Sequence, residues 1–261
     1  MSQVALFKRL RTSGGWMAWL CAELVRGLRE QPRLPQGLRP RAVDGTTVQG
    51  PASTGTEWRV LHYALDLIEL NCDWVELSDV HGAELLERVP MRKGDVLLAD
   101  RYYLRPAGVR AAAAAGAYVL VRLRWCHPAM LSAAGAEFKA LRHAARGLRV
   151  GQVGSWPVSL LVTGGEPVAG RVVATKLPAP VAAKAERTAA KKASKKTREI
   201  DPRTLKAAHF VMVFTTIPAP LLGAGAVLEL YRCRWQIELA FKRLKQLLKL
   251  GRLPHQAPDW S

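Results

Sequence analysis

Hydrophobic and polar positions follow different rhythms along the chain. Over residues 5 to 31, leucine and tryptophan recur at helical spacing, which predicts one or two short helices separated at Gly14-Gly15. Prolines at positions 32, 35 and 40 end this region. From Arg41, runs rich in valine, leucine and aromatic residues are separated by turn-forming residues. They predict strands over 41–48, 58–66 and 72–77.

Helices and strands are expected to alternate after these three strands. The pattern predicts a helix over residues 83–88, a strand over 95–99, a helix over 106–115 and a strand over 117–123. This order is typical of an α/β layer rather than of an all-β sandwich. We therefore expect an α/β fold.

Residues 125–216 lack this regularity. Short β-like pieces cover 159–163, 171–175 and 209–214, with many glycine and proline breaks between them. The region also contains a low-complexity basic run, Lys184–Arg198. Three interpretations of this run stay open: a mobile loop, a helix that folds on DNA, and a merely solvated tract. We interpret the whole region as an insertion.

An amphipathic pattern dominates the end of the chain. Residues 221–250 follow Pro218 and Pro220 and stop at Gly251, which predicts one long helix. Five polar residues lie on it at steps of three, four, four and three, within an arc of roughly 80° on one face. They are Tyr231, Arg234, Glu238, Lys242 and Lys245. Such a face is either a salt-bridged solvent surface or a carboxylate surrounded by groups that bind phosphate.

Charge narrows the class of partner. The chain has 39 Lys and Arg residues against 21 Asp and Glu residues, a formal net charge of +18. Such an excess indicates a nucleic-acid partner, although a genome that favours arginine on solvated faces would also produce it. No apolar run is long enough to cross a bilayer, and no secretory signal is present. The four cysteines are scattered and indicate neither a zinc site nor disulfides. We expect a cytoplasmic protein with no membrane partner.

Two aspartates are candidates for catalysis. Asp44 interrupts an apolar strand pattern and is followed by Gly-Thr-Thr, and Asp100 ends the apolar run 96–99. Either residue alone has an ordinary explanation, as part of a hairpin turn or as the polar end of a strand. Together with Glu238 they form a set of three carboxylates. Carboxylates suit hard ions such as Mg²⁺, and two such ions activate water and stabilise both oxygens during phosphodiester cleavage.

Basic residues on the last helix complete this hypothesis. Arg234, Lys242 and Lys245 are expected to hold the DNA backbone by charge. Tyr231 is expected to donate a hydrogen bond to a phosphate or to pack on a sugar.

These motifs resemble those of the DDE transposases of the IS-four family of insertion sequences. The resemblance rests on Asp44-Gly45-Thr46-Thr47, on Leu98-Ala99-Asp100-Arg101, and on the signature Y-x2-R-x3-E-x6-K. Tyr231, Arg234, Glu238 and Lys245 meet that signature. The resemblance implies an RNase-H-like mixed sheet flanked by helices, with a mostly β insertion between the second Asp and the Glu. It divides the chain into a helical remnant (1–39), a first core part (40–124), the insertion (125–216) and the catalytic helix (217–261).

The resemblance also implies an activity. Members of the family cut and join DNA by a cut-and-paste route, with two Mg²⁺ or Mn²⁺ ions that Asp44, Asp100 and Glu238 would bind here. The implied partners are the terminal inverted repeats, target DNA and a second copy of the chain in a synaptic complex, in a bacterial cytoplasm on the nucleoid. Trp125 and Trp156 are candidates for an aromatic residue that stabilises a flipped base.

Some features depart from the family pattern. Tyr102 stands where members often have glycine, and both ends of the chain are shorter than in typical members. We therefore expect a catalytic core that is truncated at both ends. The alternative functions are an inactive, DNA-binding transposase remnant and a nuclease or resolvase on the same fold.

Overall fold

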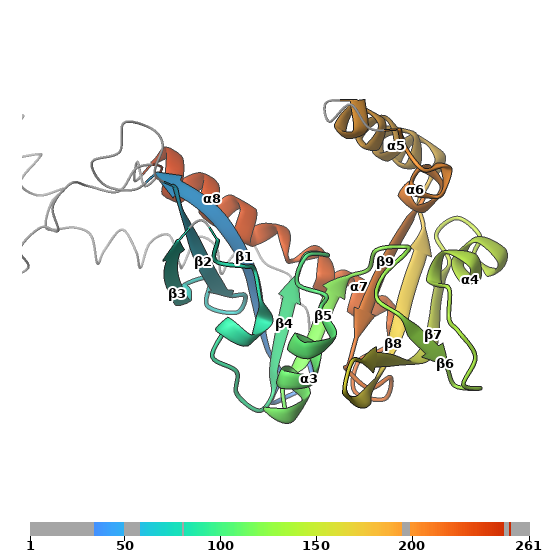
Figure 1. Cartoon of the computed structure of the whole chain (residues 1–261), viewed down its shortest axis with the longest axis horizontal. Helices are drawn as coiled ribbons and strands as arrows, with labels where there is room; N and C mark the ends of the chain where they lie inside the picture. Colours follow the sequence, from blue (N-terminus) through green and yellow to red (C-terminus); the bar gives the residue numbers. More distant parts are fainter. Residues whose placement is uncertain (1–33, 50–57, 80, 195–198, 248–250, 252–261) are drawn as a thin grey trace, which may run out of the picture.

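A nine-stranded mixed sheet forms the body of the protein. The computed structural model describes residues 34–49, 58–79, 81–194, 199–247 and 251 (Figure 1). The strands are β1 (Arg39–Gln49), β2 (Trp58–Asp66), β3 (Cys72–Asp79), β4 (Asp95–Ala99), β5 (Tyr118–Arg122), β6 (Met130–Ser132), β7 (Val153–Val162), β8 (Gly165–Lys176) and β9 (Phe210–Thr215). The helices are η1 (Leu86–Arg88), α3 (Pro106–Ala114), α4 (Ala140–Gly147), α5 (Ala179–Ser194), α6 (Pro202–Ala208), α7 (Ala224–Arg232) and α8 (Trp235–Gln246).

The strand order is β3-β2-β1-β4-β5-β9-β8-β7-β6. The three central strands β1, β4 and β5 run parallel, whereas β2 and β3 on one side and β9, β8, β7 and β6 on the other pair antiparallel. All five residues of β4 are buried, as expected for a parallel strand covered on both faces. The α/β fold class is therefore confirmed.

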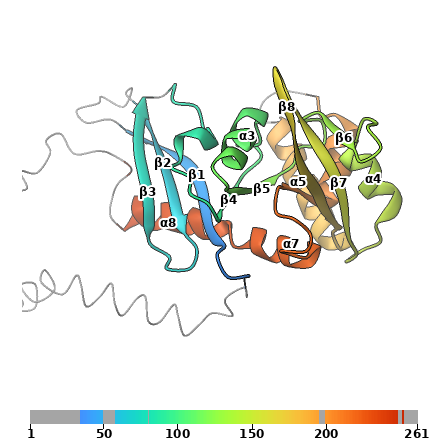
Figure 2. The same cartoon turned by 90° about the horizontal axis from the view of Figure 1, so that it is seen from below.

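Helices cover the two faces of the sheet in different ways. Along β4, Val96 and Leu98 point to the face that α7 and α8 cover, and Leu97 and Ala99 point to the face that carries α3. Figure 2 shows α7 and α8 on one side of the sheet and α3 on the other. Two hydrophobic clusters result, one on each face, and the active-site candidates lie where the α7–α8 face meets the ends of the parallel strands.

Most of the predicted strands are confirmed. The strands expected over 58–66 and 95–99 match β2 and β4, and the other predicted strands and the helix over 106–115 differ at their ends or lie within longer elements. The helix expected over 83–88 is wrong, because only a 3-10 turn forms at Leu86–Arg88. Val89 precedes Pro90 and is extended, which stops any helix there. The predicted helices within 5–31 lie outside the described residues.

The region 125–216 is mixed rather than mostly β. Its described part contains β6 to β9 together with α4, α5 and α6. The three helices are rich in alanine, lysine and arginine, which have high helix propensity. The basic run is helical through Ser194, as part of α5, and residues 195–198 lie outside the described part. α5 stands away from the sheet and packs on α6 (Figure 1).

The structure also bears on cysteine pairing and on membrane spans. Among the described residues, Cys72, Cys126 and Cys233 form no disulfide bond. Among the residues that the structure describes, no helix combines the length and the apolar character needed to cross a bilayer.

A buried ion network fixes the first residues of β1. Arg41 is 2% exposed, and its Nη1 donates to Asp95 Oδ2 at 2.9 Å and to the Pro90 carbonyl at 2.6 Å. Its Nη2 pairs with Asp73 of β3, and Arg39 Nη2 donates to Asp73 Oδ1 at 2.6 Å. Because these carboxylates belong to β3 and β4, the network ties the three strands together at one end of the sheet.

Removing Arg41 is expected to destabilise the fold strongly. In an Arg41→Ala variant, Asp95 stays buried without its main counter-charge, and the free energy of unfolding should fall by about 3–5 kcal/mol. Urea denaturation measures this loss. Lys139→Ala, which breaks the exposed pair with Glu137, is the control and should cost about 1 kcal/mol or less. Equal losses in the two variants would contradict the role assigned to the network.

Candidate active site

Asp44 lies in the middle of β1 and faces α7 and α8. Its neighbours Ala42 and Val43 belong to the clusters on opposite faces of the sheet, so by alternation Asp44 shares the α7–α8 face with Ala42. Its Oδ1 accepts a hydrogen bond from the Gly45 backbone N–H at 2.9 Å. Its Oδ2 lies 3.6 Å from Arg234 Nη1, at the junction of α7 and α8.

Asp100 lies next to Asp44 because of the β1–β4 register. Ala42 pairs with Leu98 in this parallel ladder, and the same register continued by two residues sets Asp44 beside Asp100. Asp100 follows the last residue of β4, and its Oδ1 accepts the Tyr102 backbone N–H at 2.6 Å. The structure therefore brings the two predicted aspartates together from separate strands.

The predicted single helix over 221–250 is wrong, because the chain bends between α7 and α8. Around Cys233 and Arg234 the backbone bonds are of the tighter i→i+3 kind, for example Arg234 N–H to the Tyr231 carbonyl at 3.1 Å. No proline or glycine marks this bend in the sequence. Tyr231 lies in α7 and Glu238 in α8, and Arg234 between them contacts both side chains.

Tyr231 and Arg234 link the bend to the two aspartates. Tyr231 Oη donates to the Ala99 carbonyl at 3.3 Å, directly before Asp100. Arg234 reaches Asp44 through Nη1 and Glu238 Oε1 through Nη2, the latter at 2.5 Å. One guanidinium thus bridges a strand-borne and a helix-borne carboxylate. The other two predicted residues of this segment, Lys242 and Lys245, lie further along α8. Lys242 is exposed and Lys245 is half-buried.

Burial and like charge make Asp44 a weak acid. Burial is the largest effect on its pKa, and Asp100 and Glu238 add to it, whereas the Gly45 N–H and Arg234 oppose it. The pKa of Asp44 rises from 3.8 to about 6. The pKa of Arg234 is also raised, which favours its charged form. Burial lowers its pKa, but Tyr231, Glu238 and Asp44 raise it, and the net direction is upward. The three carboxylates therefore act on one another electrostatically.

The donor set suits hard cations, although its side chains are not arranged around one. Among the described residues, no three His, Cys, Asp or Glu side chains are grouped closely enough to hold a metal ion. The side chain of Glu238 is 60% exposed and turned to Arg234. The charges of Asp100 and Glu238 nonetheless act on Asp44 and raise its pKa. Carboxylate oxygens are the donors that Mg²⁺ and Mn²⁺ take. We conclude that their chemistry fits a divalent cation.

The sequence interpretation missed several cations beside Asp100. Arg122, the last residue of β5, donates through Nη2 to the Phe210 carbonyl at 3.1 Å. Burial lowers its pKa, and Arg101 and Arg234 lower it further, so these three cations lie near one another. The Arg124 guanidinium lies 4.5 Å from the centre of the Tyr102 ring. Arginines at the end of a strand carry no sequence signal that separates them from ordinary solvated charges.

A fourth carboxylate was also missed. Burial, followed by the charges of Asp44 and Asp100, raises the pKa of Glu84 to about 6, and Arg105 opposes this rise. The sequence pattern assigned Glu84 to a helix, and nothing in its local sequence marks it as different from other helical glutamates.

The two tryptophans proposed for base contact are both engaged within the protein. Trp125 Nε1 donates to Thr204 Oγ1 at 3.1 Å, and the Arg203 guanidinium lies 4.4 Å from its ring centre. Trp156 packs at 6.3 Å, between ring centres, from both Phe138 and His143. Both are half-buried, and their role toward DNA stays a prediction. Trp235, next to Arg234, is 50% exposed.

Comparison with known proteins identifies the class of this α/β protein. Residues 35–259 match the family described as "Transposase DDE domain". The chain belongs to this family of insertion-sequence DDE transposases. It is similar to the putative transposase InsL of insertion sequence element IS186A from Escherichia coli strain K12, at 34% identity over 99% of this chain and 71% of that protein. The transposase of insertion sequence element IS421 from Escherichia coli is similar to the same extent.

Replacing the buried charge of Asp44 by the neutral asparagine is expected to stabilise the fold at neutral pH but not at acidic pH. Between about pH 4 and pH 6 the folded chain keeps a proton on Asp44 that the unfolded chain has lost, so the stability of the parent falls as pH rises through this window. Asp44→Asn removes this loss. Denaturation in EDTA should show the variant more stable by roughly 2 kcal/mol at pH 7 and similar to the parent near pH 4.

An exposed carboxylate provides the control for this experiment. Glu229 of α7 is exposed, and Glu229→Gln makes the same change in charge. Its effect on stability should be small and nearly independent of pH. If Asp44→Asn were no more stable than the parent at pH 7, the burial of an unfavourable charge at Asp44 would be contradicted.

Proposed function

We propose that this chain catalyses metal-dependent DNA strand cleavage and strand transfer during cut-and-paste movement of an insertion sequence. One observation carries the proposal: in a chain of the DDE transposase family, Arg234 pairs with both Asp44 and Glu238, and the charges of Asp100 and Glu238 raise the pKa of Asp44. Homologous transposases cut and join DNA, so a shared set of carboxylates and cations is the natural centre for that chemistry.

The fold has a proposed division of its own. We assign β1 to β5 to an RNase-H-like core, because β3-β2-β1-β4-β5 is a continuous mixed sheet with parallel centre strands. Residues 125–216 are the proposed insertion, and β9 extends the same sheet by pairing antiparallel with β5. Residues 217–261 return the chain to the core with α7 and α8, and residues 1–39 precede it.

Asp44, Asp100 and Glu238 are the residues that would hold the divalent ions, two Mg²⁺ or Mn²⁺. Such ions would supply a water that is nucleophilic at neutral pH and would stabilise the attacking and leaving oxygens. Asp44 contributes to this only when ionised, which its pKa of about 6 permits at neutral pH. Glu238 must turn away from Arg234 to join the aspartates, and its exposed side chain has the room to do so.

Arg234 then serves the DNA rather than the carboxylates. Its guanidinium has the fork geometry that binds phosphate oxygens through two hydrogen bonds. Arg101 and Arg122 place further positive charge beside Asp100, and Tyr231 keeps the bend of the helices attached to the end of β4. Lys242 and Lys245 extend the basic surface along α8. The proposed partners are the terminal inverted repeats, target DNA and a second copy of the chain, on the bacterial nucleoid.

The alternative of an inactive remnant that only binds DNA accounts for the basic charge but not for the grouped carboxylates. A nuclease or resolvase would use the same carboxylates and differs by lacking the joining step. Cleavage and joining assays on one DNA therefore separate the three functions.

The first test is metal-dependent nicking of a DNA duplex that carries the end of the element encoding this chain. The parent is expected to nick in Mg²⁺ or Mn²⁺ and not in EDTA. Glu238→Gln should lower the rate by about 100-fold or more, because it removes a charged oxygen donor from the site. Glu229→Gln, on the exposed side of α7, should nick at the parent rate.

Two outcomes would count against this function. A folded parent that binds DNA without nicking it would leave the remnant as the function, and nicking without joining would favour a nuclease. Nicking that survives in Glu238→Gln would exclude the proposed set of carboxylates.

Contacts of α8 with phosphate predict a change in salt dependence. Lys242→Ala and Lys245→Ala should each weaken binding to duplexes of any sequence and should reduce the slope of log K against log [salt] by about one unit. Fluorescence anisotropy over a series of NaCl concentrations measures the slope. Lys139→Ala, in an exposed ion pair before α4, is the control. Unchanged slopes for both α8 variants would place this helix away from the DNA.

A further inference from the structure

α5 and α6 form a helical hairpin between the neighbouring strands β8 and β9. β8 ends at Lys176 and β9 begins at Phe210, and the two helices stand beyond this end of the strands (Figure 1). The Leu177 N–H donates to the His209 carbonyl at 2.8 Å and closes the base of the hairpin. Glu186 Oε1 of α5 lies 2.6 Å from His209 Nε2, and α5 packs on α6. These contacts hold α5 at the end of the sheet.

α5 has one inward face and one basic face. Ala182 is 2% exposed and Glu186 is half-buried, one helical turn apart on the inward side. Lys184, Arg187 and Lys191 are exposed, and their spacing of three and four residues places them within an arc of about 60° on the opposite side. Among the residues that the structure describes, no carboxylate pairs with any of the three. This basic face of α5 therefore presents unpaired positive charge to solvent.

Alternating aromatic rings and guanidinium groups connect the hairpin to Asp100. The Tyr102 N–H donates to Asp100 Oδ1 at 2.6 Å, and the Arg124 guanidinium lies 4.5 Å from the centre of the Tyr102 ring. Trp125 follows Arg124, and the guanidinium of Arg203 in α6 lies 4.4 Å from the centre of its ring. A continuous row of contacts thus runs from the proposed catalytic centre to the helix on which α5 packs.

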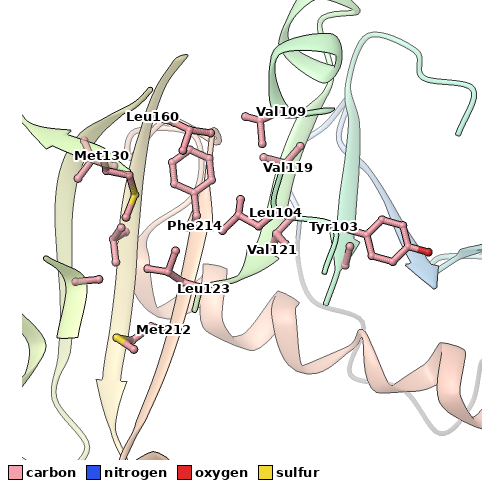
Figure 3. Close-up of a cluster of buried hydrophobic side chains, with 14 of the residues drawn as sticks. Tyr103, Leu104, Val109, Val119, Val121, Leu123, Met130, Leu160, Met212 and Phe214 are labelled. Carbon is pink, nitrogen blue, oxygen red and sulfur yellow. The ribbon is translucent and has the colours of Figure 1, made fainter. Parts of the chain in front are cut away.

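The end of β5 adds positive charge to this row. Leu123 donates its N–H to the Met212 carbonyl at 2.9 Å, and both side chains lie in the cluster on the α3 face (Figure 3). By alternation, Arg122 points to the α7–α8 face, on which Asp44 lies. Arg122 and Arg124 are both half-buried. Cations therefore lie between the proposed catalytic centre and the hairpin.

We propose that the basic face of α5 binds the phosphate backbone of duplex DNA away from the cleaved bond, as a second anchor that does not depend on sequence. The inference rests on the proposed function, because the row of contacts begins at Asp100. The basic face is roughly 10 Å long, a length over which duplex DNA carries about six phosphate charges on its two strands. Three unpaired cations on such a face bind the backbone by charge and read no base.

The composition of α5 favours DNA over a protein partner. Val181 is its one large apolar side chain among those exposed, whereas the centre of a protein interface is apolar and depleted of lysine. A merely solvated surface has acids interspersed with its bases. Glu186 is the single acid of α5, and it pairs with His209 on the inward side rather than with the basic face.

Salt-dependent binding of the full chain to duplex DNA tests the proposal in EDTA, in which no nicking is expected. The duplex carries the end of the element and extends beyond it on both sides. Lys184, Arg187 and Lys191 are replaced together by alanine, which favours a helix, and circular dichroism checks that the fold is retained. This α5 variant should lose about two to three units of the slope of log K against log [salt], and its Kd should rise about tenfold or more.

A variant that removes three charges elsewhere is the matched control. Arg142, Arg146 and Arg149 are exposed, in or beside α4, which packs in the cluster on the α3 face. Replacing these three by alanine should change the slope by less than about one unit. Arg187→Lys keeps its charge and should retain the parent slope. Equal losses in the α4 and α5 variants would attribute the effect to net charge and overturn the inference.

Hydroxyl-radical footprinting locates the second anchor. The parent is expected to protect the cleaved position and a separate stretch of backbone. The α5 variant should lose the separate stretch and keep the protection at the cleaved position. A uniform loss of protection would contradict a separate anchor. An α5 variant that binds DNA as the parent does but differs in mass by sedimentation would assign the face to a second copy of the chain and also overturn the inference.

The outcomes separate this inference from the proposed function. A parent that nicks and joins DNA without any contact that depends on α5 would overturn the inference and leave the proposed function intact. A parent whose binding depends on α5 but that does not nick DNA would overturn the proposed function and leave α5 as a DNA-binding face.

Discussion

The parallel pairing of β1 with β4 is the constraint on which the candidate site depends. It places Asp44 level with Asp100, although 55 residues separate them in the sequence. A slip of one residue would turn Asp44 to the α3 face and away from Arg234. The buried network of Arg41, Asp73 and Asp95 opposes such a slip, because it crosses the same strands at the start of the ladder. The buried ion network thus helps to fix the strand register that puts Asp44 on the same face as Arg234.

Grouping acids in this way has an energetic consequence that Arg234 only partly offsets. Asp44 and Glu84 both have a pKa raised to about 6. At neutral pH both carboxylates are therefore ionised at a cost in folding free energy. Arg234 bridges Asp44 and Glu238 on one face of β1, and on the other face Arg105 partly offsets the negative charge around Glu84. The buried charges are therefore unfavourable for stability, and destabilised charges of this kind are typical of functional sites.

The sequence predicted what depends on local pattern and missed what depends on packing. Val96 to Ala99 are apolar at every position and predicted β4, and the same run pointed to Asp100 at its end. Asp44 and Glu238 could be selected because each interrupts or organises a pattern. Glu84 could not, because its environment comes from a loop that folds back on Gly45. The helix expected around it failed at Val89, which precedes proline, and α5 could not be separated from a loop because its alanines and lysines suit a helix without indicating what it packs on.

Periodicity and packing both contribute to the site where α7 is followed by α8. Arg234 pairs with Glu238 four residues later and contacts Tyr231 three residues earlier, so helical spacing is kept across the junction. Val227 and Leu230 of α7 and Ile237 and Phe241 of α8 are buried in the same hydrophobic cluster on this face of the sheet. Tyr231 then reaches the end of β4, and Arg234 reaches β1. Helical spacing predicts the shared polar face, whereas the contacts with Ala99 and Asp44 depend on how that face packs against the sheet.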